Sequence, residues 1–185
     1  VETLTFPLKE VRFPAKRGAI SAWINSRSWW GQKAIGGSFL FSIGARNKPV
    51  YGLPQNYRVT VKGGGAYFNV KHRPTVNEFH HFALNWDAET FELFIDGQSK
   101  AKGQVGDKPI VTRLLHIGRN CSDLQNANAL IDEFAIFRRP LSGREVDAIH
   151  NSLRPLRLKS GLALEALQNR WVFFRDEARG TLRFK

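Results

Sequence analysis

The sequence lacks several features by which a chain can reveal its class. Its 185 residues contain one cysteine, Cys121, which excludes an intrachain disulfide framework. No stretch approaches the run of about 20 apolar residues that a membrane-spanning helix needs. The first residues contain no basic segment followed by an apolar stretch, so we expect no signal peptide there. The fold must therefore be held by burial alone, which a chain of this length permits.

Acidic residues are scarce relative to basic ones. The chain has 28 Lys and Arg against 16 Asp and Glu, a formal net charge of +12. Such a surface attracts anionic polysaccharide, acidic protein, anionic lipid or nucleic acid without choosing among them. No phosphate loop, zinc-ligand spacing or aromatic RNA-binding motif accompanies the charge. We therefore expect a glycan or an acidic protein as the partner, and not nucleic acid.

Helical periodicity is missing from most of the chain, and a period of two residues takes its place. Alternation over 79–86 and 91–96, with a polar stretch between them, predicts a β-hairpin. Asp96-Gly97 then predicts a tight turn. Further strands are predicted at 19–25, 39–43, 57–62, 66–71, 113–117 and 129–137. Many short strands with turns between them indicate a two-sheet sandwich or jelly roll.

One helix is predicted after the last of these strands, near 142–151. Ser142 and Glu145 have the spacing of a capping box, in which each side chain satisfies a backbone N–H of the first turn. Leu141 and Val146 occupy the two positions of a hydrophobic staple. We expect this helix to pack against the sandwich.

The character of the chain changes beyond Leu153. A basic linker is followed by an expected short helix at 160–168 and by strands at 171–174 and 181–184. A segment of about thirty residues cannot bury a core of its own. We therefore divide the chain into a sandwich at 1–153 and an extension at 154–185 that packs on the sandwich or extends it.

Three segments, in order, resemble laminin-G-like jelly rolls of the concanavalin-A-like superfamily. They are ISAWI at 20–24, the hairpin from FHHFALNW to LFIDG at 79–97, and an ending made of LHIG, IDEFAIF and PLSGREV at 115–146. The resemblance implies an all-β fold of two antiparallel sheets. Relatives bind carbohydrates, glycosaminoglycans or proteins, and many are modules of larger extracellular or envelope proteins. The resemblance therefore also implies an extracellular or cell-envelope location.

A strand-borne pair of carboxylates, as used by glucanases of this superfamily, is missing. Retaining glycosidases need two carboxylates about 5 Å apart. Asp87 and Glu89 fall in the predicted hairpin loop, where side chains point into solvent. Asp132 and Glu133 are adjacent, so they point to opposite sides of a strand. We therefore expect no enzymatic activity.

The resemblance also implies a structural calcium ion. Asp132 matches the position of an Asp that relatives use as a ligand, and Asp123 and Asn126 lie in a nearby oxygen-rich loop. The alternative is that Asp132 caps a turn and the loop is solvated. His80 and His81, being adjacent on a strand, cannot chelate one ion together.

Aromatic and basic residues are the candidates for ligand contact. Trp29 and Trp30 stand in a polar stretch, where exposed tryptophan is unusual and could stack on a sugar ring. We add Tyr51, Tyr57 and Arg58 to this predicted site. Basic groups that could recognise an anion occur at Arg12, Lys16, Arg17, Lys71, Arg73, Arg138, Arg139, Arg154, Arg157 and Lys159.

Two functions stay open at this point. The first is a non-catalytic module that binds carbohydrate or a glycosaminoglycan-like anionic ligand. The second is a structural or assembly domain that docks on a larger complex through its basic surface and its C-terminal tail. The sequence does not name the ligand.

Overall fold

The computed structural model describes residues 4–26, 39–45, 48–54, 58–67, 74–110, 112–119, 127, 129–152, 173–176 and 180–183. It contains one helix, α1 (Gly143–Ser152), within these ranges. The strands are β1 (Leu4–Pro7), β2 (Gly18–Ser26), β3 (Phe39–Ala45), β4 (Lys48–Pro54), β5 (Arg58–Val61), β6 (Gly64–Tyr67), β7 (Phe79–Trp86), β8 (Thr90–Ile95), β9 (Gln98–Gln104), β10 (Leu114–Ile117), β11 (Ala129–Phe137), β12 (Phe173–Asp176) and β13 (Gly180–Arg183).

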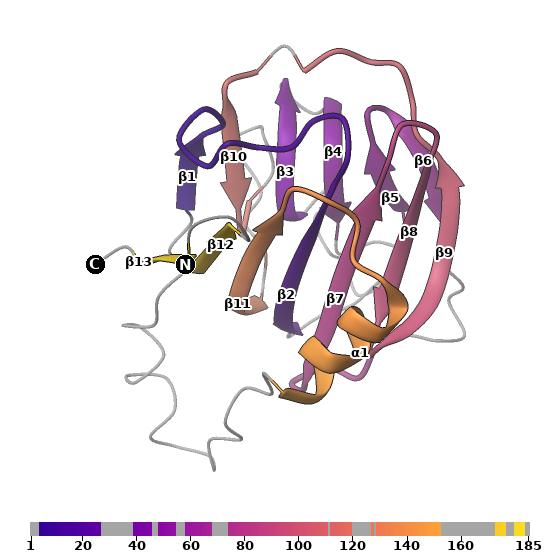
Figure 1. Cartoon of the computed structure of the whole chain (residues 1–185), viewed down its shortest axis with the longest axis vertical. Coiled ribbons are helices and arrows are strands. Elements are labelled where there is room, and N and C mark those ends of the chain that lie inside the picture. The colour runs from indigo at the N-terminus through magenta and orange to yellow at the C-terminus, as the bar shows by residue number, and fades with distance from the viewer. Residues whose placement is uncertain are drawn as a thin grey trace.

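Two antiparallel sheets face each other and form the predicted sandwich (Figure 1). One sheet has six strands in the order β1-β10-β3-β4-β5-β6, and the other has five in the order β11-β2-β7-β8-β9. The predicted fold class, a two-sheet antiparallel jelly-roll sandwich with one short helix, is confirmed. Among the described residues, no helix is long and apolar enough to cross a membrane.

The core lies between the two sheets because each strand alternates its side chains. On β2, Ile20, Ala22 and Ile24 point inward, and on the six-stranded sheet Phe41 and Leu115 do the same. Each large apolar side chain that is removed from water contributes about 1.5–3 kcal/mol to stability. This burial, together with strand pairing, fixes the positions of the strand ends from which the loops emerge.

Two strands, β4 and β9, were not predicted from the sequence. β4 carries Pro49 and Pro54, which read as loop signals, and both lie near its ends. β9 is polar along most of its length, with Lys100 and Lys102 on a strand that forms the edge of its sheet. Lysines on an edge strand discourage pairing with another chain, so the polar sequence is a property of the edge position.

The turn between β8 and β9 confirms the prediction made for Asp96-Gly97. Asp96 has φ of 50° and Gly97 has φ of 76°, the left-handed conformation that a two-residue hairpin turn requires at both positions. The register pairs Ile95 with Gln98, so the turn contains only these two residues.

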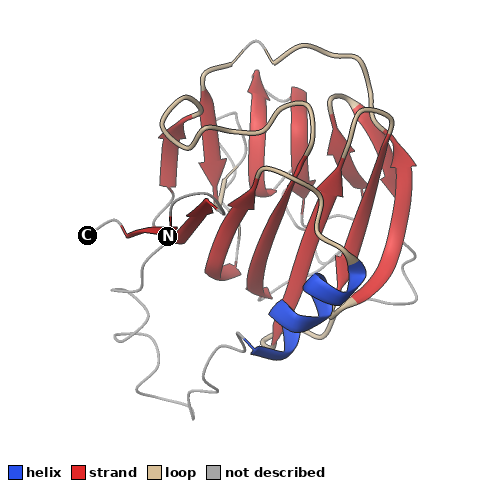
Figure 2. Cartoon of the chain, viewed as in Figure 1, coloured by secondary structure: helices blue, strands red, loops and turns tan. Residues whose placement is uncertain are grey.

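Helix α1 covers the outer face of the five-stranded sheet (Figure 2). Its capping box is present: Ser142 Oγ accepts from the N–H of Glu145 at 3.3 Å, and Glu145 Oε2 accepts from the N–H of Ser142 at 2.7 Å. Val146 and Leu141 pack with Ala19 and Ala83 in a second, smaller hydrophobic cluster beneath the helix. The predicted helix near 142–151, with its cap and staple, is confirmed.

The C-terminal strands β12 and β13 form an antiparallel hairpin, as the sequence predicts. β12 approaches β11 at the edge of the five-stranded sheet, and Figure 1 shows the two side by side. The linker and the helix expected at 160–168 lie outside the described residues, so the division of the chain at 153/154 stays a prediction.

The sandwich is closed along one side, where glycines let the two sheets meet. A Cβ on Gly64 would lie 2.1 Å from the carbonyl oxygen of Gln104, and one on Gly106 would lie 2.2 Å from that of Lys62. Both are backbone atoms, which cannot move aside as a flexible side chain can. Only glycine fits at these two positions.

This closure predicts a contrast between two glycine substitutions. Gly64→Ala forces backbone displacement and should lower the free energy of unfolding by about 1–3 kcal/mol. Gly143→Ala meets no atom within 4 Å, at the start of α1, and should be neutral or stabilise by up to about 1 kcal/mol. Urea denaturation measures both, and a Gly64→Ala variant as stable as the wild type would contradict the account.

Candidate functional site

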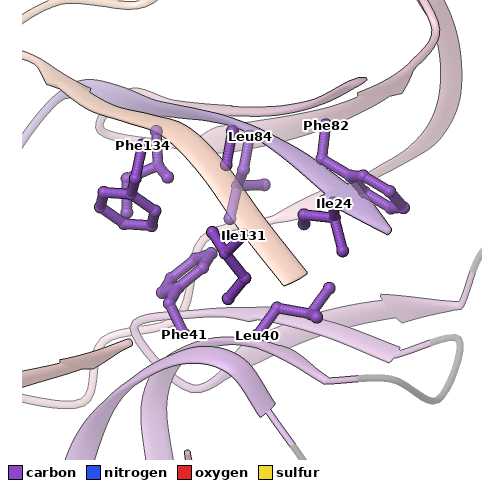
Figure 3. Close-up of a pocket in the computed structure, with 9 residues that line it drawn as sticks. Ile24, Leu40, Phe41, Phe82, Leu84, Ile131 and Phe134 are labelled. Carbon is purple, nitrogen blue, oxygen red and sulfur yellow. The ribbon is translucent and has the colours of Figure 1, made fainter. Parts of the chain in front are cut away.

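A small cavity lies inside the sandwich, but its chemistry does not suit a polar ligand. It measures about 10 Å³ and is lined by apolar side chains of both sheets (Figure 3). Ile24, Phe82 and Leu84 approach it from one sheet, with Leu40 and Phe41 from the other. A cavity of this size holds about one water at most, and an apolar lining keeps it dry. It is a packing feature of the core and not a binding site.

Loops from distant parts of the chain meet at one end of the sandwich, which we call the basic end. It comprises residues 8–17, 62–63, 87–89, 105–110, 112–113 and 138–140, and Figure 1 shows the loops that follow β1, β5, β7 and β9 toward the top of the molecule. The strand register explains the meeting. Gly18 pairs with Trp86, Ala19 pairs with Phe137, and these strands therefore release their loops at the same level.

Close packing at Gly18 joins three of these segments. A Cβ on Gly18 would lie 2.5 Å from Pro14 Cγ, 2.8 Å from the carbonyl oxygen of Phe137 and 3.0 Å from the ring of Trp86. Trp86 Nε1 also donates a 2.9 Å hydrogen bond to the carbonyl oxygen of Pro14. Phe13 stacks on the Trp86 ring with 5.5 Å between the ring centroids. The 8–17 segment is thus anchored to the end of the sheet.

Backbone hydrogen bonds join the remaining segments. The N–H of Leu8 donates to the carbonyl oxygen of Arg113 at 2.7 Å. The N–H of Lys108 donates to the carbonyl oxygen of Lys62 at 3.0 Å, and the N–H of Val105 donates to the carbonyl oxygen of Glu89 at 2.7 Å. Because these loops are bonded to one another, the side chains they carry are held in a defined arrangement.

Charge is segregated toward the basic end. Among the side chains that the structure describes, this end carries nine Lys or Arg and four Asp or Glu, whereas the rest carries four and seven. The nine are Lys9, Arg12, Lys16, Arg17, Lys62, Lys108, Arg113, Arg138 and Arg139, and the four are Glu10, Asp87, Glu89 and Asp107. A surplus of basic groups on adjoining loops produces a positive potential that attracts anions. The basic end is therefore a candidate site for an extended anion.

One acid of this end, Asp87, is committed to the structure of its loop. Its Oδ1 accepts hydrogen bonds from the backbone N–H groups of Thr90 and Glu89, both at 2.8 Å. These two bonds hold the pKa of Asp87 below its usual value. The prediction that Asp87 and Glu89 lie in a solvent-facing hairpin loop is confirmed, since both are exposed.

Two further carboxylates with a displaced pKa are engaged elsewhere. Burial raises the pKa of Asp96, but hydrogen bonds from His80 and from the backbone of His81 outweigh burial and lower it. The Arg139 guanidinium and the Ser142 cap hold the pKa of Glu145 well below its usual value. A general acid needs the opposite, a raised pKa. Both carboxylates are bound to structural partners, and their lowered pKa values are the opposite of what a general acid needs.

The ligand contact predicted for Tyr51 is wrong. Tyr51 is 0% exposed, and its hydroxyl donates a 2.7 Å hydrogen bond to the carbonyl oxygen of Ala15. Its ring packs edge-on against Phe13 and Trp86, and burial raises the pKa of its hydroxyl. Alternation on β4 turns this side chain into the core, which the isolated tyrosine in the sequence could not reveal.

The other predicted ligand contacts cannot be placed. Trp29, Trp30 and Tyr57 lie outside the described residues, and of Arg58 only the backbone is described, at the start of β5. A sugar-stacking role for the Trp29-Trp30 pair stays a prediction.

Of the three residues predicted to bind calcium, the structure describes only Asp132. Asp132 is 7% exposed, and its Oδ1 accepts a 3.0 Å hydrogen bond from the N–H of Glu133, where β11 carries a bulge. Asp123 and Asn126 lie outside the described residues. Within the described ranges no group of three His, Cys, Asp or Glu side chains is placed to hold a metal ion. Calcium binding stays a prediction, since one carboxylate does not make a calcium site.

Comparison with known proteins agrees with the fold. A laminin G family model, described as the concanavalin A-like lectin/glucanases superfamily, matches residues 3–147, and the chain belongs to this family. A search of curated protein sequences finds no match. The resemblance inferred from the sequence motifs is thereby confirmed.

Solved structures with the same fold come from larger proteins. A Trypanosoma rangeli sialidase in complex with 2,3-difluorosialic acid is 15% identical with a TM-score of 0.58, over 80% of this chain and 26% of that one. A second structure comes from a study of botulinum neurotoxin type C, whose cell entry depends on interaction with two ganglioside molecules. It is 16% identical with a TM-score of 0.57, over 83% of this chain and 40% of that one. The chain thus spans well under half of the proteins it resembles, and the likeness concerns the fold.

The reassignment of Tyr51 generates a prediction. Tyr51→Phe removes the donor to Ala15 inside the protein and should lower the free energy of unfolding by about 1 kcal/mol, with no effect on ligand affinity. Thermal or urea denaturation measures the first quantity, and titration with a sulfated oligosaccharide measures the second. Weaker binding at unchanged stability would return Tyr51 to the ligand site.

Proposed function

We propose that this chain is a non-catalytic recognition module whose basic end binds an anionic glycan, one bearing carboxylate or sulfate groups. The observation that carries the proposal is the segregation of charge: a surplus of basic side chains at one end and a surplus of acidic ones elsewhere, among the residues that the structure describes. Such a field attracts a polyanion and orients it toward one surface.

The construction of the basic end supports this role. Its loops emerge from a rigid sheet and are bonded to each other and to the core through Trp86 and Tyr51. Basic side chains on fixed loops lose less conformational freedom on binding than those on a free tail, so more of the attraction becomes affinity. Lys and Arg stems also offer an apolar flank to a sugar ring.

The comparisons support a glycan over other anions. Among the similar structures, the sialidase is in complex with a sialic acid derivative and the botulinum neurotoxin type C structure concerns an interaction with gangliosides, although only the fold is shared with this chain. The carboxylates whose pKa is displaced are turned to structural use, which supports binding without hydrolysis. By family resemblance we also propose that the module works in the extracellular space or the cell envelope.

The alternative is a structural or assembly domain that docks on an acidic protein. The approach of β12 to β11 is the observation that favours it, because this strand of the C-terminal extension lies against the sandwich. The same basic end would serve such a partner. Binding of free oligosaccharide distinguishes the two, since an assembly domain requires no affinity for a sugar alone.

The proposal predicts a location-specific effect of charge removal. The triple variant Lys9→Gln, Lys16→Gln, Arg113→Gln removes three exposed cations from the basic end and should weaken binding of a heparin-derived oligosaccharide at least about tenfold, mostly at low salt. Isothermal titration at about 50 and about 200 mM salt measures the effect.

A matched control removes the same charge elsewhere. The control variant combines Lys100→Gln and Lys102→Gln on β9 with Arg144→Gln on α1. Its affinity for the heparin-derived oligosaccharide should stay within about twofold of the wild type. A neutral oligosaccharide should bind neither the wild type nor the variants. Equal losses in both triple variants would mean that net charge, and not the basic end, governs binding. No binding by the wild type at low salt would reject the glycan-binding function.

The tryptophan pair requires a separate experiment because it lies outside the described residues, and the strand ends on either side of it are at the opposite end of the sandwich. Residues 27–38 follow Ser26, which pairs with Ala129, and precede Phe39, which pairs with Pro54, both far along the strands from Gly18 and Trp86. If Trp29→Ala/Trp30→Ala abolishes binding and the basic-end triple variant does not, the ligand does not bind at the basic end and our placement is wrong.

A further inference from the structure

Two histidines and a tryptophan meet where helix α1 lies on the outer face of the five-stranded sheet. Trp23 of β2 pairs in register with His81 of β7, and their ring centroids are 5.4 Å apart. His150, in the last turn of α1, stacks on Trp23 with 5.4 Å between centroids and 21° between the ring planes. The rings of His81 and His150 are 5.9 Å apart. The helix thus docks through a histidine placed over another histidine.

This cluster is buried but not fully hydrogen-bonded. His81 is 0% exposed and Trp23 is 4% exposed. His81 Nε2 lies 2.8 Å from Ser21 Oγ. His81 Nδ1, His150 Nδ1 and Trp23 Nε1 are buried without a hydrogen-bond partner in the described structure. An imidazolium at His81 would carry a second N–H that no described group accepts, so the docked arrangement suits the neutral ring.

The charged groups around His81 come from three elements. Helix α1 contributes His150 and Asp147, and Asp147 lies against Gly97 of the β8–β9 turn. That turn contributes Asp96, and β7 itself contributes His80, whose Nδ1 holds Asp96 Oδ2 at 2.6 Å. From β2 the neighbours are Ser21 and Trp23, which carry no charge. Asp96 is therefore the carboxylate that favours a charged His81, and it is already bound by His80 and by the backbone of His81.

The balance of these influences disfavours protonation in the docked state. Burial, then the charge of His150, lowers the pKa of His81 to about 4, and Asp96 opposes them only in part. When α1 leaves the sheet, His81 regains contact with water and its pKa returns toward the ordinary 6.5. Since the undocked state then binds the proton more tightly, docking is strongest above about pH 7 and weakens as the pH falls from about 6.5 toward 4.

We infer that helix α1 is a pH-sensitive latch, docked on the sheet at neutral pH and released in acid when the buried His81 takes up a proton. Two further sets of contacts at α1 and its N-terminal cap do not share this sensitivity. Val146 and Leu141 are apolar, and Glu145 keeps its charge in this range because Arg139 and the Ser142 cap hold its pKa low. The histidine cluster is the acid-sensitive part of the interface, and α1 is the element that leads into residues 153–185.

Hydrogen exchange tests the latch. Protection of the α1 amides from Val146 to His150, corrected for intrinsic exchange rates, is compared with that of Leu93 in β8 at about pH 7 and about pH 5. In the wild type, α1 should lose at least about tenfold more protection than β8. His81→Gln should remove this difference. The control variant His116→Gln, which changes a buried histidine of the other sheet, should keep it.

Equal loss of protection in α1 and β8 would mean global unfolding and would overturn the latch, as would a His81→Gln variant that keeps the difference. If His81→Gln does not fold, the wild type decides the matter through an NMR titration of its histidine Cε1–H signals. The latch requires His81 to gain its proton together with the opening of α1. Protonation of His81 while α1 stays protected would overturn it.

Discussion

The pairing of β2 with β7 is the interaction on which the rest of the structure depends. Its register runs from Gly18 opposite Trp86 to Asn25 opposite Phe79. The inward side chains of the pair build the centre of the core, whereas the outward ones, Trp23 and His81 among them, form the surface on which α1 docks. A shift by one residue would exchange these two faces. The same register brings the loops after Trp86 and before Gly18 together, which creates the basic end.

Much of the fold was predictable because its signals are local. Alternation along β7 and β8, the Asp96-Gly97 turn and the Ser142 capping box each occupy a few consecutive residues, and all are present. β4 and β9 were missed because proline and an edge position give them the composition of loops. The buried state of Tyr51 depends on which way β4 faces, which its neighbours in sequence do not determine.

The candidate site was less predictable, because it is assembled from residues far apart in the chain. The sequence singled out Arg12, Lys16, Arg17 and Arg138 as basic groups, but their meeting with Lys62, Lys108 and Arg113 follows from strand order alone. A count of charges could not separate a basic end from a uniformly basic surface. The sheet topology makes the separation, and the proposed function therefore rests on tertiary structure more than on any motif.

We propose a rigid sandwich with two independent surfaces, a basic end for an anionic glycan and a helix whose docking depends on pH. The central claim of this proposal is that the ligand contacts the basic end. Amide chemical shifts recorded during titration with a sulfated oligosaccharide test it most directly. We predict that the shifts will change at Lys9, Lys108 and Arg113 and stay constant at the Asp96-Gly97 turn. Changes confined to that turn and its neighbours would contradict the account.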